Sequence, residues 1–137
     1  MTERVQFTLP MPPSVNNQYV TVNGRRVLSS EARSWGKRAG AALNGVFPPA
    51  FVAVAEQGYL ALFIDFFFET PLRRDLDGGL KLAQDVICRA LGVDDRRVVD
   101  IHLVKRIDPL RPRIEVEMEA LPHWSFDDEH QVLPHEA

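Results

Sequence analysis

The stretch GYLALFIDFFFE, residues 58–69, is the most apolar run in the chain and decides how the flanking sequence is interpreted. Every second residue from Leu60 to Phe68 is apolar, and the residues between them are also apolar except Asp65. A strand that is apolar on both faces lies in the interior of its sheet. The run therefore predicts a central β-strand.

The sequence after this run predicts a helix and then two strands. LDGGLKLAQDVICRALG has an apolar stripe at helical period and Gly92 at the expected C-terminal cap, with Gly78 and Gly79 expected in the first turn. RRVVDIHLVKRI and RPRIEVEMEA follow as a pair of strands joined by DPLRP. In the last strand apolar residues alternate with glutamates, which indicates one solvated face.

The sequence before the run predicts a strand, a hairpin and another helix. VQFTLP alternates like a strand and is stopped by prolines, and Asn23-Gly24 between two β-prone runs favours a type I′ hairpin turn. Ser29 or Ser30 can cap a helix that begins at Glu31 and ends near residues 44–45, with Pro48-Pro49 as a break. The order predicts an α/β (α+β) single domain, with two main helices packed against a mixed sheet.

Composition limits the classes of protein that fit. With 137 residues, 45% of them hydrophobic and 26% charged, the chain has the size and composition of one soluble domain. No apolar run is long enough to cross a bilayer and no export signal is visible, so we expect a cytoplasmic protein with no membrane partner. The single cysteine, Cys88, is expected in the core.

The net charge of −3 at first disfavours a nucleic-acid partner. However, all 16 Lys and Arg residues precede residue 121, whereas four acidic residues fall in the final 16 residues. We therefore expect a nearly neutral domain over residues 1–121 and a flexible acidic tail over residues 122–137. The basic residues occur in pairs that form either a local positive surface or ordinary solvated faces.

RRDLDGGLK, residues 73–81, follows the central strand and carries the clearest chemical signal. Asp75 and Asp77 flank one residue, so in extended geometry both carboxylates point the same way, with roughly 7 Å between their Cβ atoms. Mg²⁺ binds through one or two such carboxylates together with substrate phosphates. Lys81 lies one helical turn beyond Asp77. The alternative is structural, with Asp77 as a helix N-cap and Lys81 as its surface partner.

A second acidic pair, Asp94-Asp95, follows the predicted helix in LGVDDRRVVD. As a pair on its own it is more typical of a plain acidic turn than of a metal site. Asp65 and His102 lie within predicted strands, where a hydrogen-bonded aspartate and a structural histidine are ordinary. A D-x-D pattern alone is also shared by unrelated metal enzymes, including sugar-nucleotide transferases.

Three motifs in order, LPMPPSVNN, RRDLDGGLK and LGVDDRRVVD, resemble the RusA family of Holliday-junction resolvases over residues 4 to about 119. The resemblance implies a small homodimeric endodeoxyribonuclease that depends on Mg²⁺, with Mn²⁺ as a substitute, and makes paired symmetric nicks in four-way DNA junctions. It also implies a role in DNA recombination and repair. Such proteins are frequent in prophages, so both a prophage and a host origin are compatible with the resemblance.

By position, the resemblance assigns roles to individual residues. Asp75, Asp77 and Asp95 match the metal-binding carboxylates, and Lys81 matches the essential lysine. Expected contacts to DNA phosphates come from six residues: Asn16, Arg73, Arg74, Arg96, Arg97 and Lys105.

The chain departs from the family pattern at Gly78, where the family commonly has asparagine, and in its acidic balance and tail. The first departure removes one polar contact to DNA, and the second predicts weaker or more salt-sensitive binding. The alternative function is a branched-DNA binding protein that has lost catalysis.

Overall fold

The computed structural model describes residues 2–72 and 74–126 of the chain. Its elements are β1 (Glu3–Pro10), η1 (Val15–Asn17), β2 (Tyr19–Val22), β3 (Arg25–Leu28), α1 (Ser30–Ala42), α2 (Pro49–Gln57), β4 (Tyr59–Phe68), α3 (Leu80–Leu91), η2 (Asp95–Arg97), β5 (Val98–Ile107) and β6 (Arg113–Leu121).

The main sheet has four strands in the order β1-β6-β4-β5. Strand β4 pairs antiparallel with β6 and parallel with β5, so the sheet is mixed and β4 lies in its interior, as its apolar sequence predicts. The two last strands, β5 and β6, flank β4 on opposite sides.

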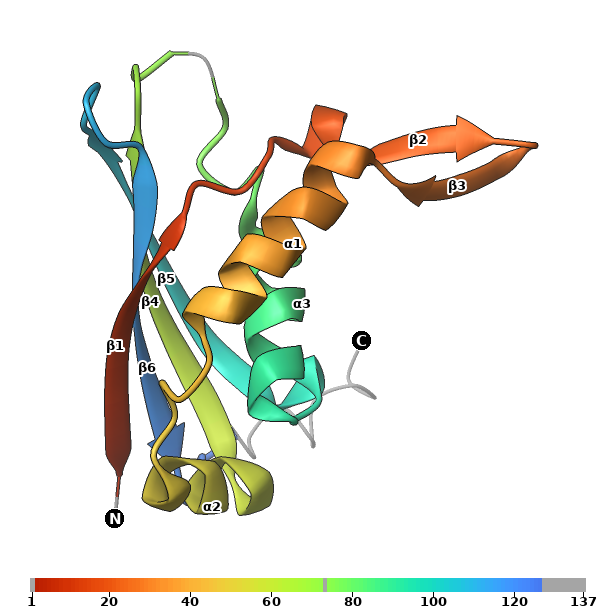
Figure 1. The fold of residues 1–137 in the computed structure, drawn as a ribbon. Coiled ribbons are helices and arrows are strands. Elements are labelled where there is room, and N and C mark those ends of the chain that lie inside the picture. The colour runs from red at the N-terminus through yellow and green to blue at the C-terminus, as the bar shows by residue number, and fades with distance from the viewer. Residues whose placement is uncertain (1, 73, 127–137) are drawn as a thin grey trace, which may run out of the picture.

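All three α-helices cover the same face of this sheet, and the core lies between the two layers (Figure 1). Trp35 of α1, Phe51 of α2 and Ile87 of α3 are fully buried there, in one hydrophobic core that also includes Phe66 of β4. The predicted single α+β domain with a mixed sheet is thus confirmed, but the count of two main helices is wrong.

The unpredicted helix is α2, which follows the proline pair interpreted as a break. Pro49 occupies its first position, where a missing backbone N–H costs nothing and the fixed φ suits a helix. Phe51 and Ala55, four residues apart, bury one side of α2 against the sheet. The proline pair therefore ends one segment and begins the next helix.

The hairpin β2–β3 projects from the body of the protein (Figure 1). Asn23 and Gly24 have φ values of 53° and 76°, both left-handed, as a type I′ turn requires. The Ser29 hydroxyl accepts a hydrogen bond from the Ala32 N–H at 3.0 Å and caps α1, which confirms one of the two predicted caps.

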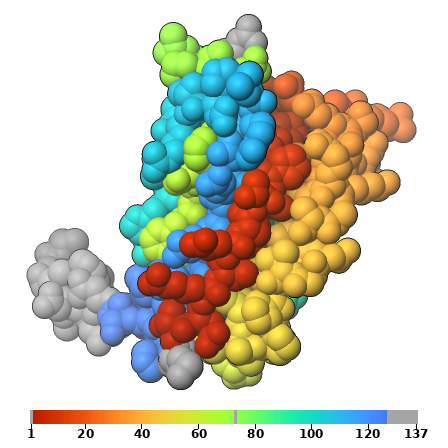
Figure 2. All heavy atoms as spheres, turned by 60° about the vertical axis from the view of Figure 1, so that its left-hand side comes forward, coloured from red at the N-terminus to blue at the C-terminus, as the bar shows by residue number. Residues whose placement is uncertain are grey.

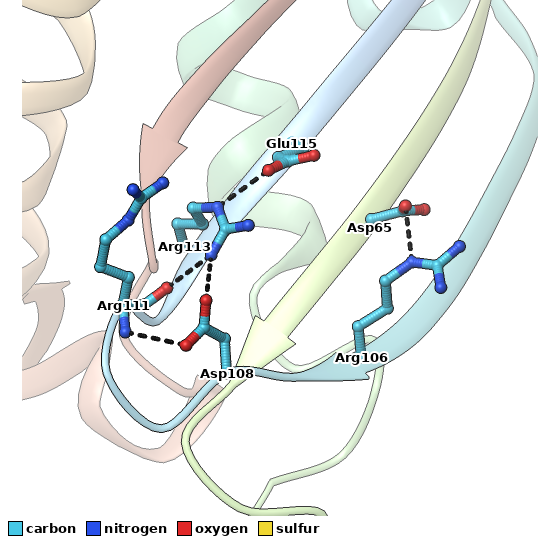
Figure 3. Close-up of polar contacts among 6 residues, drawn as sticks. All are labelled: Asp65, Arg106, Asp108, Arg111, Arg113 and Glu115. Atoms are coloured by element: carbon cyan, nitrogen blue, oxygen red, sulfur yellow. Dashed lines mark hydrogen bonds and ion pairs between the residues drawn. The ribbon is translucent and has the colours of Figure 1, made fainter.

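No helix of the described residues covers the second face of the main sheet, which is lined by ion pairs. Figure 2 brings this side forward and shows β1 (red) beside β6 (blue). Arg113 bonds to Asp108 at 2.8 Å and to Glu115 at 2.9 Å, and Arg106 bonds to Asp65 at 2.8 Å (Figure 3). The acidic side chains drawn in Figure 3 are thus neutralised by arginines.

The segment after β6 is described as far as Phe126, whose ring packs edge-on against Tyr59 at 5.8 Å between centroids. The rest of the predicted acidic tail, residues 127–137, lies outside the described residues. Within the described chain, every helix is too short or too polar to span a membrane.

Candidate active site

A groove of about 300 Å³ runs along the exposed side of α3 and collects residues from three segments. Asp77 comes from the turn before α3, Lys81 and Asp85 come from successive turns of α3, and Asp95 comes from η2. The two predicted motifs therefore face one groove, because α3 ends in a tight turn at Gly92 with φ of 81° and the chain folds back.

Asp85 is the groove residue that sequence reasoning missed. Its carboxylate lies 3.5 Å from the Lys81 ammonium, and the two side chains are 34% and 74% exposed. The signal was present, since Asp85 lies four residues after Lys81 and hence on the same face of α3. The ion pair holds the ammonium over the groove.

The turn that carries Asp75 and Asp77 is closed by backbone hydrogen bonds. The Asp75 carbonyl accepts from the Gly78 N–H at 3.2 Å and the Asp77 carbonyl accepts from the Leu80 N–H at 3.1 Å. Helix α3 begins after this turn, with Gly79 at its N-cap and no side-chain cap. The prediction that both glycines fall inside the first helical turn is therefore wrong, and so is the capping alternative for Asp77.

The side chain of Gln18, which lies 60 residues before Gly78, holds this turn in place. Its side-chain amide is 3% exposed and donates to the Pro13 carbonyl at 3.0 Å and to the Gly78 carbonyl at 2.9 Å. A buried amide that satisfies two carbonyls fixes their separation. The proline-rich motif and the aspartate motif are thus parts of one structural unit.

Pro12 completes this unit. The Arg74 guanidinium donates to the Pro12 carbonyl at 2.8 Å, and a Cβ on Gly79 would lie 2.5 Å from the Pro12 Cγ. Only glycine fits at position 79 without displacing the proline ring. The sequence motif has two adjacent glycines because the second one packs directly on the proline-rich segment.

The two aspartates of the acidic pair after α3 have different surroundings. The Asp94 carboxylate caps η2 by accepting from the Arg96 N–H at 2.8 Å and binds the Arg96 guanidinium at 3.0 and 3.2 Å. These hydrogen bonds, the side-chain one foremost, lower the pKa of Asp94 to about 2. Asp95 instead lines the groove. The local hydrogen bonds of Asp94 fit the interpretation as a plain acidic turn, whereas the metal-binding role expected of Asp95 stays a prediction.

The thiol of Cys88, in α3, is affected by these carboxylates. Burial, and then the negative charges of Asp95, Asp85 and Asp94, raise the pKa of its thiol to about 11. The thiol is buried, as predicted, and stays protonated. The charges that act on it come from both α3 and the turn after it.

The basic residues expected at DNA differ in what they contact within the protein. Arg97 donates to the Gly58 carbonyl and Lys105 to the Pro71 carbonyl, both at 2.8 Å, while Arg96 is 88% exposed beside Asp94. Arg74 is turned inward, and its buried Nε has no partner among the described atoms. Asn16 is exposed in η1, and Arg73 lies outside the described residues.

The fit to a divalent metal rests on donor type and on the absence of competing cations. Asp75, Asp77 and Asp95 make no ion pair with any described Lys, Arg or His, in contrast to the acidic residues of Figure 3. Yet no three His, Cys, Asp or Glu side chains among the described residues gather closely enough to hold a metal. Asp75 also lies outside the groove lining. The donors thus suit Mg²⁺ bound through one or two carboxylates, with the remaining ligands from water and substrate.

Comparison with solved structures yields only weak likenesses. Two structures of 2C-methyl-D-erythritol-2,4-cyclodiphosphate synthase, one bound to CDP, align with TM-scores of 0.36 at 9% and 11% identity, covering 88% of this chain and 99% of each of theirs. The synthase from Plasmodium vivax gives 0.30 at 14% identity, covering 87% and 94%. No curated protein matches the chain in sequence. These values carry no conclusion about function.

In contrast to the solved structures, a protein-family model matches most of the chain. The family model described as endodeoxyribonuclease RusA matches residues 10–119, which include the proline-rich segment, the turn of Asp75 and Asp77, and Asp95. The match thus spans all three motifs that meet around the groove. The chain belongs to the RusA endodeoxyribonucleases, a family of Holliday-junction nucleases that hydrolyse DNA.

Proposed function

We propose that this chain is a Mg²⁺-dependent nuclease that resolves four-way DNA junctions by paired, symmetric nicks during recombination and repair. The observation that carries the proposal is the α3 groove, in which Asp77 and Asp95 make no ion pair with any described residue and lie near the Lys81 ammonium. Solvent-accessible carboxylates without cationic partners are available to a metal, and the family match supplies the class of substrate.

Asp75, Asp77 and Asp95 would hold the metal ion, with Mn²⁺ as a substitute. A bound Mg²⁺ ion supplies Lewis acidity at the scissile phosphate and lowers the pKa of a coordinated water. Lys81 would contact the phosphoryl oxygens, where negative charge increases in the transition state. Asp85 restricts the ammonium to this side of α3, and the turn braced by Gln18 sets where Asp77 lies.

Contacts to the DNA backbone would come from the cations around the groove. Arg96 follows Asp95 directly and is 88% exposed, and Lys105 lies on the edge strand β5. Asn16, Arg73, Arg74 and Arg97 complete the proposed set. Because phosphates carry no base identity, such contacts predict preference for DNA shape over sequence.

A homodimer accounts for paired nicks by a chain of this size. A four-way junction has two-fold symmetry, and a two-fold dimer places one groove against each of two strands. Each site then cuts one strand.

The direct test compares a synthetic four-way junction with a linear duplex of the same arm sequence, in Mg²⁺ and in EDTA. We expect symmetric nicks in the junction only, and only with the metal. Tight junction binding without nicking in Mg²⁺ or Mn²⁺ would instead favour the inactive branched-DNA binding protein.

A further inference from the structure

A second, larger groove lies between α1 and α3, and Asp85 lines both grooves. Its volume is about 730 Å³, within the range of roughly 300–1,000 Å³ typical of ligand sites. Leu43, Phe47, Val52, Leu82 and Val86 give it an apolar floor. None of the residues assigned to metal or DNA lines it.

Two glycines of α1 open onto this groove. Gly36 and Gly40 lie four residues apart and hence on one face of the helix, and both line the groove. A Cβ on Gly40 would meet no atom within 4 Å, and one on Gly36 would only touch the Val86 Cγ2 at 4.0 Å. Glycine weakens a helix interior relative to alanine. Packing within the described chain therefore gives no reason for these glycines, whereas close approach of another backbone would.

The rim of the groove is positively charged. Arg33, Lys37 and Arg89 line it, and its one carboxylate, Asp85, is already paired with Lys81. A second copy of this chain packed groove to groove would bring the same cations against each other. An occupant with acidic flanks would be attracted instead.

We propose that the α1–α3 groove docks an acidic amphipathic helix of a partner protein. Its apolar face would lie on the floor of the groove, its backbone would approach α1 at Gly36 and Gly40, and its acidic residues would face the three rim cations. This is the helix-in-groove mode of recognition, anchored at i, i+3 and i+4 positions. A DNA backbone would use the cations but gains nothing from the apolar floor.

The test titrates the full chain with a synthetic helical peptide of about 18 residues, a length that sustains an isolated helix. The peptide carries leucine and alanine on one face and glutamate on both flanks, and the control peptide has lysine at every glutamate. Calorimetry and amide chemical shifts should show salt-sensitive binding of the acidic peptide alone, with shifts at Gly36, Gly40 and Val86.

Variants of α1 separate docking from folding. Gly40→Leu should weaken peptide binding at least about tenfold, the scale of losing one interface contact. Gly40→Ala should weaken binding less while raising the Tm, because alanine favours the helix and the site is open. Ala41→Leu, on the exposed side of α1, is the matched control and should bind like the wild type.

Four results would each overturn the proposal. The first is binding of the lysine peptide as tight as that of the acidic peptide, and the second is binding of the acidic peptide by Gly40→Leu with wild-type affinity. The third is tighter binding of a peptide spanning residues 122–137 than of the acidic peptide. The fourth is loss of junction affinity in folded Gly40→Leu. The third would make the chain's own C-terminal segment the occupant, and the fourth would make it DNA.

Discussion

The two turns at either end of α3 carry the same residue type but are held in different ways. The turn of Asp75 and Asp77 is fixed by Gln18 and Pro12, about 60 residues earlier in the chain. The turn of Asp94 and Asp95 is held chiefly by a local cap, in which the Asp94 carboxylate accepts from the Arg96 N–H, together with one longer-range hydrogen bond from Arg97 to the Gly58 carbonyl. One wall of the candidate active site therefore depends on tertiary packing, and the other chiefly on local hydrogen bonding.

This difference predicts unequal tolerance to substitution. A change in the proline-rich segment should displace Asp77 while leaving Asp95 in place, because no contact of that segment reaches η2 among the described hydrogen bonds. Three predictions follow this contrast from the larger effect to the smaller.

Gly79→Ala should cost about 3 kcal/mol of unfolding free energy, at the upper end of overpacking penalties. The new methyl group would lie 2.5 Å from the Pro12 Cγ, and a proline ring cannot turn aside. Chemical denaturation measures the loss. Gly78→Ala is the matched control, since its Cβ would lie 3.4 Å from the Asp75 carbonyl oxygen, an ordinary contact. Equal stabilities of the two variants would show that contact with Pro12 does not restrict position 79 to glycine.

Gln18→Leu should cost about 2 kcal/mol, because the buried Pro13 carbonyl and the half-buried Gly78 carbonyl lose their donor while volume is nearly kept. Junction nicking should fall by more than the folded fraction explains, since the turn of Asp77 loses its brace. Asn17→Ala is the control, because that side chain is exposed. Nicking that scales with folded protein alone in Gln18→Leu would make the brace purely structural.

Substitution of Asp94 should have the smallest effect on stability, and this effect should change with pH only under acidic conditions. Its pKa is about 2 in the folded protein, held down by hydrogen bonds from Arg96, and about 3.9 when unfolded. A lowered folded pKa stabilises the protein above pH 4, and this contribution disappears as the pH falls through 2. The Tm difference between wild type and Asp94→Asn should therefore shrink over that interval. A difference that is constant from pH 5 to pH 2 would contradict the pairing.

Much of the fold was predictable because its signals are local. Strand β4, the Asn23-Gly24 turn, the Ser29 cap and the Gly92 cap each follow from residues within one element. Helix α2 was missed because Pro49 both breaks and begins helices, and only the burial of Phe51 against the sheet decides between these.

The sequence predicted which types of residue lie at the candidate site, but not the contacts that hold them in place. The spacing of Asp77 and Lys81 is local, and so is that of Asp85, which was overlooked. The bracing by Gln18 was not predictable, because a lone glutamine after a proline-rich run has no signature of its partner at Gly78. The inward turn of Arg74 toward Pro12 likewise depends on tertiary packing.

Substitutions at Asp77, which lines the groove, and at Asp75, which lies outside its lining, most directly separate DNA binding from cleavage. Asp77→Asn and Asp75→Asn keep side-chain size and remove one charge, and Glu56→Gln makes the same charge change on exposed α2. In Mg²⁺ we expect junction nicking by each aspartate variant to fall by at least about two orders of magnitude, the scale of losing a major electrostatic contributor. Junction affinity in EDTA should stay equal or increase, since a negative charge near the phosphates is gone. A folded Asp77→Asn protein that nicks junctions at the rate of Glu56→Gln would contradict the assignment of this groove as the active site.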